Sequence, residues 1–313
     1  QERGGAGMNF WSNFYYRYRR FAKWFKLFLI LTGPGIIVMM ADNDAGGITT
    51  YTVTGAKYGY GLIWFLILLI PVAYVAQEMT VRLGAVTKRG HAEAIFDAFG
   101  SFWGWFSFLD LAFVNWLTMV TEFIGMTAAL SIFHIPAPLT VLVVSAIMMV
   151  MVLQGRYWTW EKIAIFFSFI SLIYIPAAIL VHPSVSDVLS QGMIPHFPGG
   201  FTGELFFFLL ANIGTTICPW MIFFQQSAVV DKGMKEKDRP WGQFDTFFGP
   251  VFTSLAAIFC IIPPATVLFG VPIGSAAQAA QLLLRIHPWV GTLLAIGLFD
   301  AGFLGAICIS LAS

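Results

Sequence analysis

Two carboxylates interrupt the first long apolar stretch of the chain. This stretch reads GPGIIVMMADNDAGG, so that Asp42 and Asp44 are followed at once by the paired glycines Gly46 and Gly47. A carboxylate at the depth of a bilayer costs at least ~2.5–3.5 kcal/mol on insertion scales, so two of them need a compensating partner. Paired glycines favour unwinding of a helix, and the carbonyl oxygens that unwinding frees are ligands for a cation. The alternative interpretation, in which the first span ends here and an external loop begins, stays open.

A second interruption lies in a later apolar stretch, at the sequence GTTICPW that begins at Gly214. Proline lacks a backbone N–H and clashes with the preceding turn, so a helix should kink or break before Pro219. The two interruptions fall in the first and sixth apolar spans. Spans separated by five, an odd number, belong to repeats of opposite orientation in a membrane, and paired interruptions of this kind mark a binding site near the midplane. The carboxylate of Asp44, with Asp42 as a second candidate, predicts that the site takes a cation.

Composition places these interruptions in an all-α integral membrane protein. Hydrophobic residues make up 58% of the 313 residues and charged residues only 11%, against about 25% charged residues in a typical soluble domain. Several apolar stretches reach the ~20 residues that a helix needs to cross a hydrocarbon core. Tryptophans cluster at the ends of these stretches, where amphipathic side chains meet the membrane interface; examples are Trp103, Trp105, Trp158, Trp160 and Trp241.

Eight apolar spans are predicted from these stretches. Their approximate bounds are 27–51, 62–86, 101–133, 139–153, 160–181, 204–230, 245–269 and 289–313. Placing the N-terminus inside the cell puts every lysine and arginine except Lys57 and Arg285 in the inner segments, as the positive-inside rule requires. A multi-pass protein of the cell membrane with a cytoplasmic N-terminus is therefore expected. Residues 1–26 are expected to form a basic and aromatic interfacial arm rather than a nucleic-acid-binding segment.

Four motifs occur in order along the chain: GPGIIVMMADNDAGG, then GAKYGYGLIW, then EFIG from Glu122, and GTTICPW. In these motifs the chain resembles the Nramp family of divalent metal transporters, and the resemblance covers nearly the whole sequence. Asp44 matches the metal-binding aspartate of that family. The resemblance implies a LeuT-like fold of two inverted five-helix repeats with discontinuous first and sixth helices. Residues 27–182 would form the first repeat and residues 183–313 the start of the second, which would end within the eighth of eleven or so helices.

Departures from the family pattern bear on the transported ion. Gly47 stands where the family has a metal-binding asparagine, and Cys218 stands where it has a methionine, whose thioether suits transition metals. The resulting site would be wider and rich in oxygen ligands, including the carbonyls of Ala41 and Thr215, which suits Mg²⁺ with part of its hydration shell. The chain is therefore similar to the Nramp-related magnesium transporters, a branch that carries Mg²⁺ and Mn²⁺. A broad-range transporter of Mn²⁺ and transition metals with proton coupling is the alternative.

The proton path of the family is altered as well. Met119 occupies the place of an aspartate, and Trp220 and Gln225 replace two histidines. None of these three side chains takes up a proton near neutral pH. Glu122 is either the remnant of this path or a structural carboxylate between helices. The resemblance thus implies weak or absent proton coupling.

Other classes of function are less well supported by the sequence. A cation channel would also place carboxylates and carbonyls on a pathway, but paired discontinuous helices favour alternating access. An amino-acid transporter of the same fold would bind a substrate carboxylate, which Asp44 repels. An enzyme is not expected, because the spans hold no Ser/His/Asp set and no His/Glu metal cluster. The expected partners are a divalent metal ion and the lipid bilayer, with no nucleic acid, no cofactor beyond the transported ion, and a monomeric chain.

Overall fold

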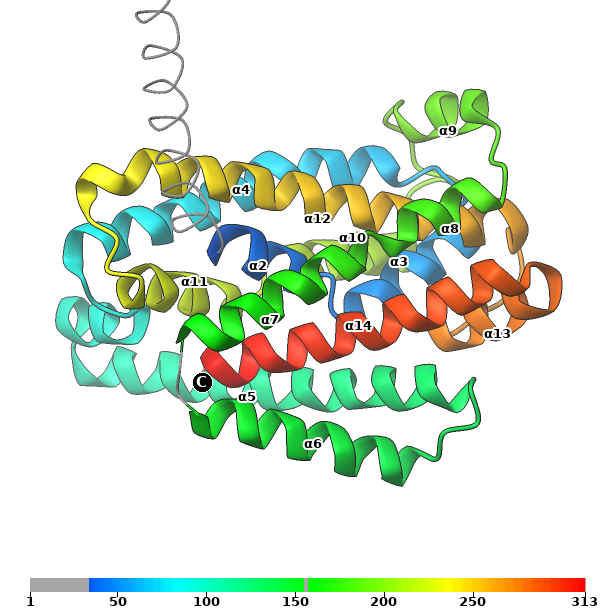
Figure 1. Ribbon diagram of the computed structural model, residues 1–313. Helices are drawn as coiled ribbons and strands as arrows, with labels where there is room; N and C mark the ends of the chain where they lie inside the picture. Colours follow the sequence, from blue (N-terminus) through cyan, green and yellow to red (C-terminus); the bar gives the residue numbers. More distant parts are fainter. Residues whose placement is uncertain (1–33, 155–156, 313) are drawn as a thin grey trace, which may run out of the picture.

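A computed structural model describes residues 34–154 and 157–312, and these residues form helices joined by short connections (Figure 1). The helices are α2 (Pro34–Ala41), α3 (Ala45–Tyr58), α4 (Ile63–Thr87), α5 (His91–Ser131), α6 (Ala137–Gln154), α7 (Tyr157–Ile170), α8 (Tyr174–Leu180), α9 (Val185–Gly192), α10 (Gly203–Thr216), α11 (Pro219–Asp231), α12 (Arg239–Val267), α13 (Ala276–Ile286) and α14 (Pro288–Ala312). Two 3-10 turns, η1 (Ser171–Ile173) and η2 (Glu236–Asp238), complete the order. Within the described ranges there is no β-strand, as the predicted all-α class requires.

Six stretches of the described chain are long and apolar enough to cross a membrane: Ile63–Thr87, His91–Ser131, Lys162–Leu180, Gly203–Asp231, Glu236–Val267 and Pro288–Ser310. The expected number was eight. The fourth expected span corresponds to a shorter apolar helix, Ala137–Leu153, and the first is divided into α2 and α3, neither of which is long enough alone. The predicted start of the third span at residue 101 matches an interruption in α5: Gly100 is non-helical, with φ of 82°, and separates a preceding helical segment that begins at His91 from the span itself.

Large apolar side chains on α5 and α6 face outward rather than into the bundle. Examples are Phe102, Trp105, Trp116, Leu142 and Met149, all of them more than half exposed. Apolar surface on this scale is not compatible with water and fits a protein whose solvent is lipid. The predicted spans on α5 and α6 therefore present the face that a bilayer would cover.

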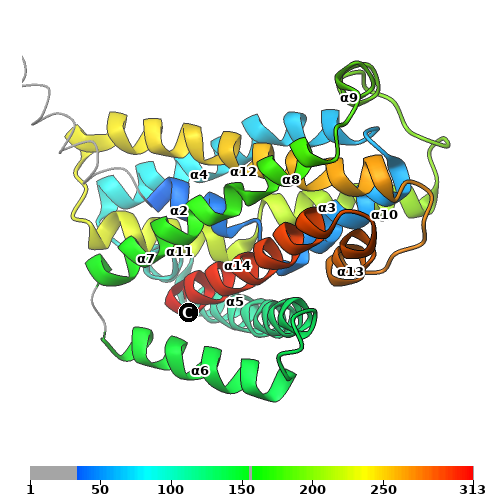
Figure 2. The ribbon, with the colours of Figure 1, turned by 45° about the vertical axis from the view of Figure 1, so that its right-hand side comes forward.

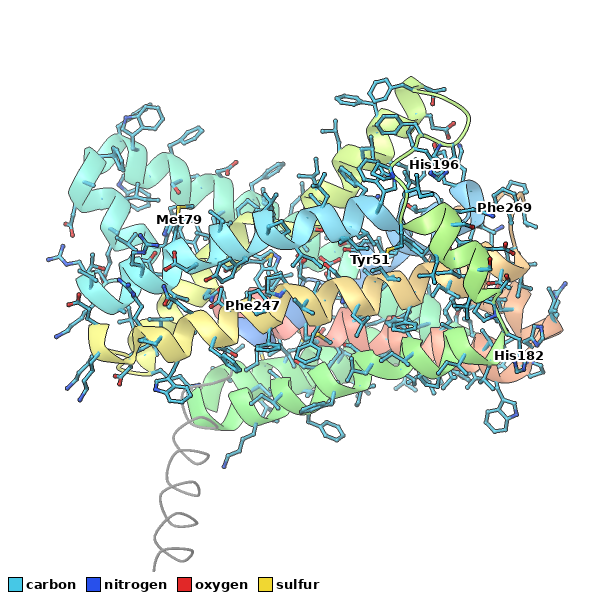
Figure 3. The ribbon with its side chains drawn as sticks, turned by 90° about the horizontal axis from the view of Figure 1, so that it is seen from above. Tyr51, Met79, His182, His196, Phe247 and Phe269 are labelled. Carbon is cyan, nitrogen blue, oxygen red and sulfur yellow. The ribbon has the colours of Figure 1, made fainter. Side chains whose placement is uncertain are left out.

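The interior contains two main apolar clusters, and the first break lies at their boundary. One cluster includes α3 side chains such as Ile48 and Tyr51, together with parts of α4, α8, α12, α13 and α14. The other includes α2 side chains such as Ile37, together with α11 side chains such as Trp220 and the end of α14. The two halves of the first broken helix are thus packed into different parts of the core. Figure 3 places Tyr51 inside the bundle, between Met79 toward one end and His182 and Phe269 at the other.

Two long helices brace the broken segments. α12 contacts α2, α3 and α4, while α14 lies between α5 and α8 and also contacts α2 and α3 (Figure 2). Close approach depends on glycines: a Cβ on Gly249 of α12 would stand 2.7 Å from the carbonyl oxygen of Gly35. Small residues at such crossings let helix backbones approach and pack closely in a membrane. α12 and α14 therefore fix the position of the break.

Candidate metal centre

The first break comprises Asp42, Asn43 and Asp44, between the end of α2 and the start of α3. Asp44 caps α3: its backbone is extended, and its Oδ1 accepts a hydrogen bond from the Gly47 amide at 2.6 Å. Aspartate at this position satisfies an amide that a new helix leaves unpaired, so the helix restarts at once. Gly46 and Gly47 consequently lie in the first turn of α3, and the prediction that they unwind is wrong. The external-loop interpretation is also wrong, because α3 continues to Tyr58.

The break frees the carbonyl oxygen of Ala41. In a continuous helix this carbonyl would accept a hydrogen bond from the amide of Ala45, four residues later. The Ala45 amide instead donates to Glu122 Oε2 of α5 at 3.1 Å. Glu122 therefore takes over the amide that would close the helix, which leaves the Ala41 carbonyl without its regular helical partner.

The second break lies between α10 and α11, as the proline predicts. Ile217 and Cys218 have non-helical backbones, and α11 begins at Pro219. Because Pro219 has no amide hydrogen, the Thr215 carbonyl lacks its regular helical partner. The Cys218 thiol donates to the carbonyl of Gly214 at 2.8 Å.

The two breaks lie against each other in space. α2 contacts α11, and α3 contacts α10. A hydrogen bond of 3.2 Å joins the Tyr51 hydroxyl of α3 to Thr215 Oγ1 of α10. Cys218 packs against the apolar cluster that contains Ala41, the last residue of α2. The structure thus brings together predicted residues from both interruptions, separated by some 170 residues of sequence.

The carboxyls of this centre are buried and lack a cationic partner among the described residues. Asp42 is 1% exposed, Asp44 5% and Glu122 0%. The ion pairs among the described residues join Lys57 to Glu204, Arg82 to Glu78 and Arg89 to Asp97. None of these cations belongs to the centre. Both carboxylate oxygens of Asp42 and Oε1 of Glu122 are buried with no hydrogen-bond partner in the described structure. Buried carboxylates without partners are costly, so these groups have to be neutralised, either by protons or by a bound cation.

Side chains alone do not make a cage for a metal ion. In the described part of the chain, no group of three or more His, Cys, Asp or Glu side chains is arranged to hold one. Gly47 adds no ligand, and a Cβ there would stand 3.2 Å from the Asp42 carbonyl oxygen and 3.3 Å from Asp44 Oδ1. An ion bound here would draw the remaining ligands from backbone carbonyls and water, as hard divalent cations do.

The predicted remnants of a proton path are only partly gathered at the centre. Glu122 lies beside Asp44: a Cβ on Gly305 of α14 would be 3.1 Å from both the Asp44 Cβ and the Glu122 Cδ. Met119 instead packs among apolar side chains. Trp220 is fully buried against Phe224. Gln225 donates to Thr246 Oγ1 of α12 at 2.9 Å.

Several residues that support the centre were not singled out from the sequence. Asn43 donates from Nδ2 to the carbonyl of Thr253 on α12 at 3.1 Å, and the Thr253 hydroxyl donates to the carbonyl of Met39. α12 therefore holds both the break itself and the end of α2 before it. Asn43 is polar within an apolar stretch, which was a signal, but nothing in the sequence around Thr253 indicates a contact 210 residues away.

Comparison with known proteins places the chain in a family. The sequence profile of the Nramp family, described as natural resistance-associated macrophage protein-like, matches residues 35–313. The chain is 26% identical over 302 residues to the divalent metal cation transporter MntH of Lacticaseibacillus casei, covering 90% of this chain and 66% of the relative. It is 24% identical over 298 residues to MntH of Yersinia pestis, covering 92% of this chain and 72% of the relative.

A solved structure shares the fold. The Eremococcus coleocola manganese transporter, in complex with an aromatic bis-isothiourea substituted compound, superposes with a TM-score of 0.73 at 21% identity, over 92% of this chain and 66% of that one. The chain thus spans about two thirds of the length of the first relatives that it matches. The broken pair of helices, the shared fold and the profile match over most of the sequence agree, and the chain belongs to the Nramp family.

Proposed function

We propose that this chain transports a divalent metal cation across the cell membrane by alternating access, with the ion bound between the two breaks. The observation that carries the proposal is the pair of buried carboxyls, Asp42 and Asp44, with both oxygens of Asp42 unpartnered. Two carboxylates without a cationic partner match the charge of one divalent ion. The freed carbonyls of Ala41 and Thr215 supply neutral oxygen ligands on either side.

Mg²⁺ is the ion that the ligand set favours. Its ligands are oxygens, and it retains several of its waters. The Cys218 thiol is engaged as a hydrogen-bond donor to Gly214, so it is not offered as a soft thiolate ligand. Gly47 contributes no side-chain ligand, so the remaining ligands would be carbonyl oxygens and water. The chain would then belong with the Nramp-related magnesium transporters.

Mn²⁺ is the second candidate. It also accepts carboxylate, carbonyl and water ligands. The relatives whose names record an activity are described as divalent metal cation or manganese transporters. A Mn²⁺ transporter with proton coupling is the corresponding alternative to Mg²⁺ transport.

Weak proton coupling forms part of the proposal. Met119, Trp220 and Gln225 do not titrate near neutral pH, and Glu122 already accepts the Ala45 amide. Conformational change would be centred on the breaks, because α2 and α3 pack into different apolar clusters. Residues 27–182 and 183–313 would form the first repeat and part of the second, in a monomer with a cytoplasmic N-terminus.

Uptake into liposomes tests this function. The purified chain is reconstituted with a Mg²⁺- or Mn²⁺-sensitive dye inside the vesicles, and a pH dye is used in parallel. We expect saturable uptake without matching acidification. Asp44→Asn should abolish uptake, whereas Asp110→Asn, an exposed carboxyl on α5, should leave it unchanged. Unsaturable flux would indicate a channel, and acidification in step with the metal would refute weak coupling.

A further inference from the structure

A second buried carboxyl, Asp300, lies in the middle of α14 and outside the metal centre. It is 2% exposed, and its Oδ2 accepts a hydrogen bond from Ser171 Oγ of η1 at 2.8 Å. Its Oδ1 is buried with no hydrogen-bond partner in the described structure. No ion pair among the described residues includes Asp300. The cost of an isolated carboxylate at this depth is therefore not met by a lysine or arginine.

A phenol packs against the same helix, α14, close to this carboxyl. Tyr174 of α8 is fully buried, and its hydroxyl likewise has no hydrogen-bond partner in the residues described. A Cβ on Gly297 of α14 would stand 2.7 Å from that hydroxyl. Gly297 and Asp300 are three residues apart, so they share one face of the helix with Cβ positions about 5–6 Å apart. Tyr174 therefore packs against the face of α14 that carries Asp300, and each of the two side chains has one unpartnered oxygen in the described structure.

The backbone opposite Asp300 departs from regular helix. Residues 171–173 form the 3-10 turn η1 between α7 and α8, and Pro176 removes the amide that would bond to the Leu172 carbonyl in a regular helix. A 3-10 stretch within a helix often marks a functional position. At membrane depth, irregular backbone is tolerated where it is buried in protein or lines a cavity. Ser171, the residue that bonds Asp300, is the first residue of this turn.

We propose that Asp300, Ser171 and Tyr174 form a binding site for one monovalent cation, either a proton on the Asp300 carboxyl or Na⁺ held between the carboxylate and the two hydroxyls. One carboxylate matches one positive charge, and two hydroxyl oxygens are suitable neutral ligands for Na⁺. The other titratable group that interacts with Tyr174 is the Cys260 thiol of α12, which supplies no positive charge. The site is separate from the carboxyls of the first break.

The position of this site on α14 connects it to the metal centre. Gly305, which packs against Asp44 and Glu122, lies five residues after Asp300. That spacing corresponds to about 7–8 Å along a helix axis. The same rigid helix therefore carries the monovalent site and one wall of the metal centre, so a cation at Asp300 is placed to influence how α14 packs beside the metal.

Thermal unfolding of the whole purified chain tests the site without any divalent ion. The protein is kept in detergent with EDTA, and NaCl replaces choline chloride at constant ionic strength, with KCl as a control for general salt effects. A second series varies pH in Na⁺-free buffer. If Na⁺ is the ligand, the wild-type melting temperature should rise by several degrees with Na⁺ and less with K⁺. If a proton is the ligand, it should fall as pH rises, because loss of the proton leaves a buried charge.

Asp300→Asn should lose the Na⁺ response, or should weaken the pH response to the part that the buried carboxyls of the metal centre supply, while Asp110→Asn, the same change at an exposed position of α5, should respond as the wild type does. Tyr174→Phe and Ser171→Ala retain the carboxyl and remove one hydroxyl each, so they test the site even if Asp300→Asn does not fold. Both should weaken the Na⁺ response or alter the pH response. The proposal is overturned if the wild type responds to neither cation, or if the Asp300→Asn, Tyr174→Phe and Ser171→Ala variants that fold respond as the wild type does.

Discussion

The two breaks interrupt their helices by different physical means. The first break depends on carboxyls. Asp44 starts α3 by capping it, and Glu122 accepts the hydrogen bond of the Ala45 amide that would otherwise have continued α2. The second break depends on the backbone, because Pro219 has no amide hydrogen to continue the helical hydrogen bonds of α10. The first break therefore carries charge, whereas the second supplies a carbonyl and a neutral thiol. A cation site built from both needs only one of them to be acidic.

The surroundings of the two breaks differ as well. The first is enclosed by α12 and α14, and glycines on neighbouring helices leave no room for added atoms beside it. The second is more open: a Cβ on Gly214 would meet nothing within 4 Å. We infer that the first break is the fixed, charged side of the site and the second is the side with freedom to move.

The largest expected difference between the breaks concerns charge. Asp42→Asn removes one of two carboxylates without removing a hydrogen bond, because both oxygens of Asp42 are unpartnered. We expect divalent affinity to fall by roughly 10- to 100-fold, the equivalent of about 1.5–3 kcal/mol for an interaction with a charged group. Cys218→Ser at the second break keeps a hydrogen-bond donor and should change Mg²⁺ affinity by less than about threefold. Equilibrium titration of both variants with Mg²⁺ decides the point, and equal losses would contradict the assignment of charge to the first break.

A pair of glycine substitutions tests the difference in packing. A Cβ on Gly125 of α5 would overlap that of Ala45, the first residue of α3. Gly125→Ala should therefore destabilise the protein by about 1–3 kcal/mol. Gly214→Ala, in the open last turn of α10, should be neutral or stabilising by up to about 1 kcal/mol. Thermal unfolding of the two variants provides the comparison, and the reverse order of stability would show that the enclosure of the first break has been misjudged.

A smaller effect is expected at the direct link between the breaks. Tyr51→Phe removes the hydrogen bond to Thr215 and no packing atoms beyond the hydroxyl. A loss of about 0.5–1.5 kcal/mol of stability is expected. Thr215→Val should reproduce most of this loss, and the double variant should be no worse than the single ones if the two hydroxyls act through the same bond. Chemical denaturation of all three variants measures this, and fully additive losses would exclude a shared interaction.

The smallest effect is expected at the exposed ends of α3 and α10, where Lys57 pairs with Glu204. Both side chains are more than one third exposed, so water and salt screen their attraction. Glu204→Gln should cost less than about 1 kcal/mol, and the cost should shrink as salt is added. A larger, salt-independent loss on thermal unfolding would mean that this pair locks the outer halves of the broken helices together.

The sequence predicted both breaks but not how the first one is built. An acidic cluster and a proline are local signals, so their positions could be found without a structure. The sequence did not show that Gly46 and Gly47 would be helical, because this depends on the capping geometry of Asp44. It also did not reveal the role of Glu122 as acceptor for the Ala45 amide or the brace from Thr253, since these contacts join segments 77 and 210 residues apart.

Helix boundaries were predicted unevenly. The third span was expected to begin at residue 101, which agrees with the non-helical Gly100, but the helical segment that precedes it from His91 was not predicted. Hydropathy identifies the part of a helix that lipid would surround and not its polar extension. Asp300 stands out as a carboxyl within an apolar stretch of the sequence, whereas its partner Ser171 could be found only from the packing of η1 on α14.

Calorimetric titration of Asp44 variants tests the central claim most directly. Asp44→Asn is the sharper variant, because asparagine also caps a helix and so removes the charge while keeping the start of α3. Wild type and the exposed control Asp110→Asn should bind Mg²⁺ and Mn²⁺ with measurable heat, and Ca²⁺ in parallel reports selectivity. Asp44→Asn and Asp44→Ala should give no binding heat over the same concentration range. Binding of either ion to a folded Asp44→Asn protein with wild-type affinity would contradict the placement of the metal centre at the first break.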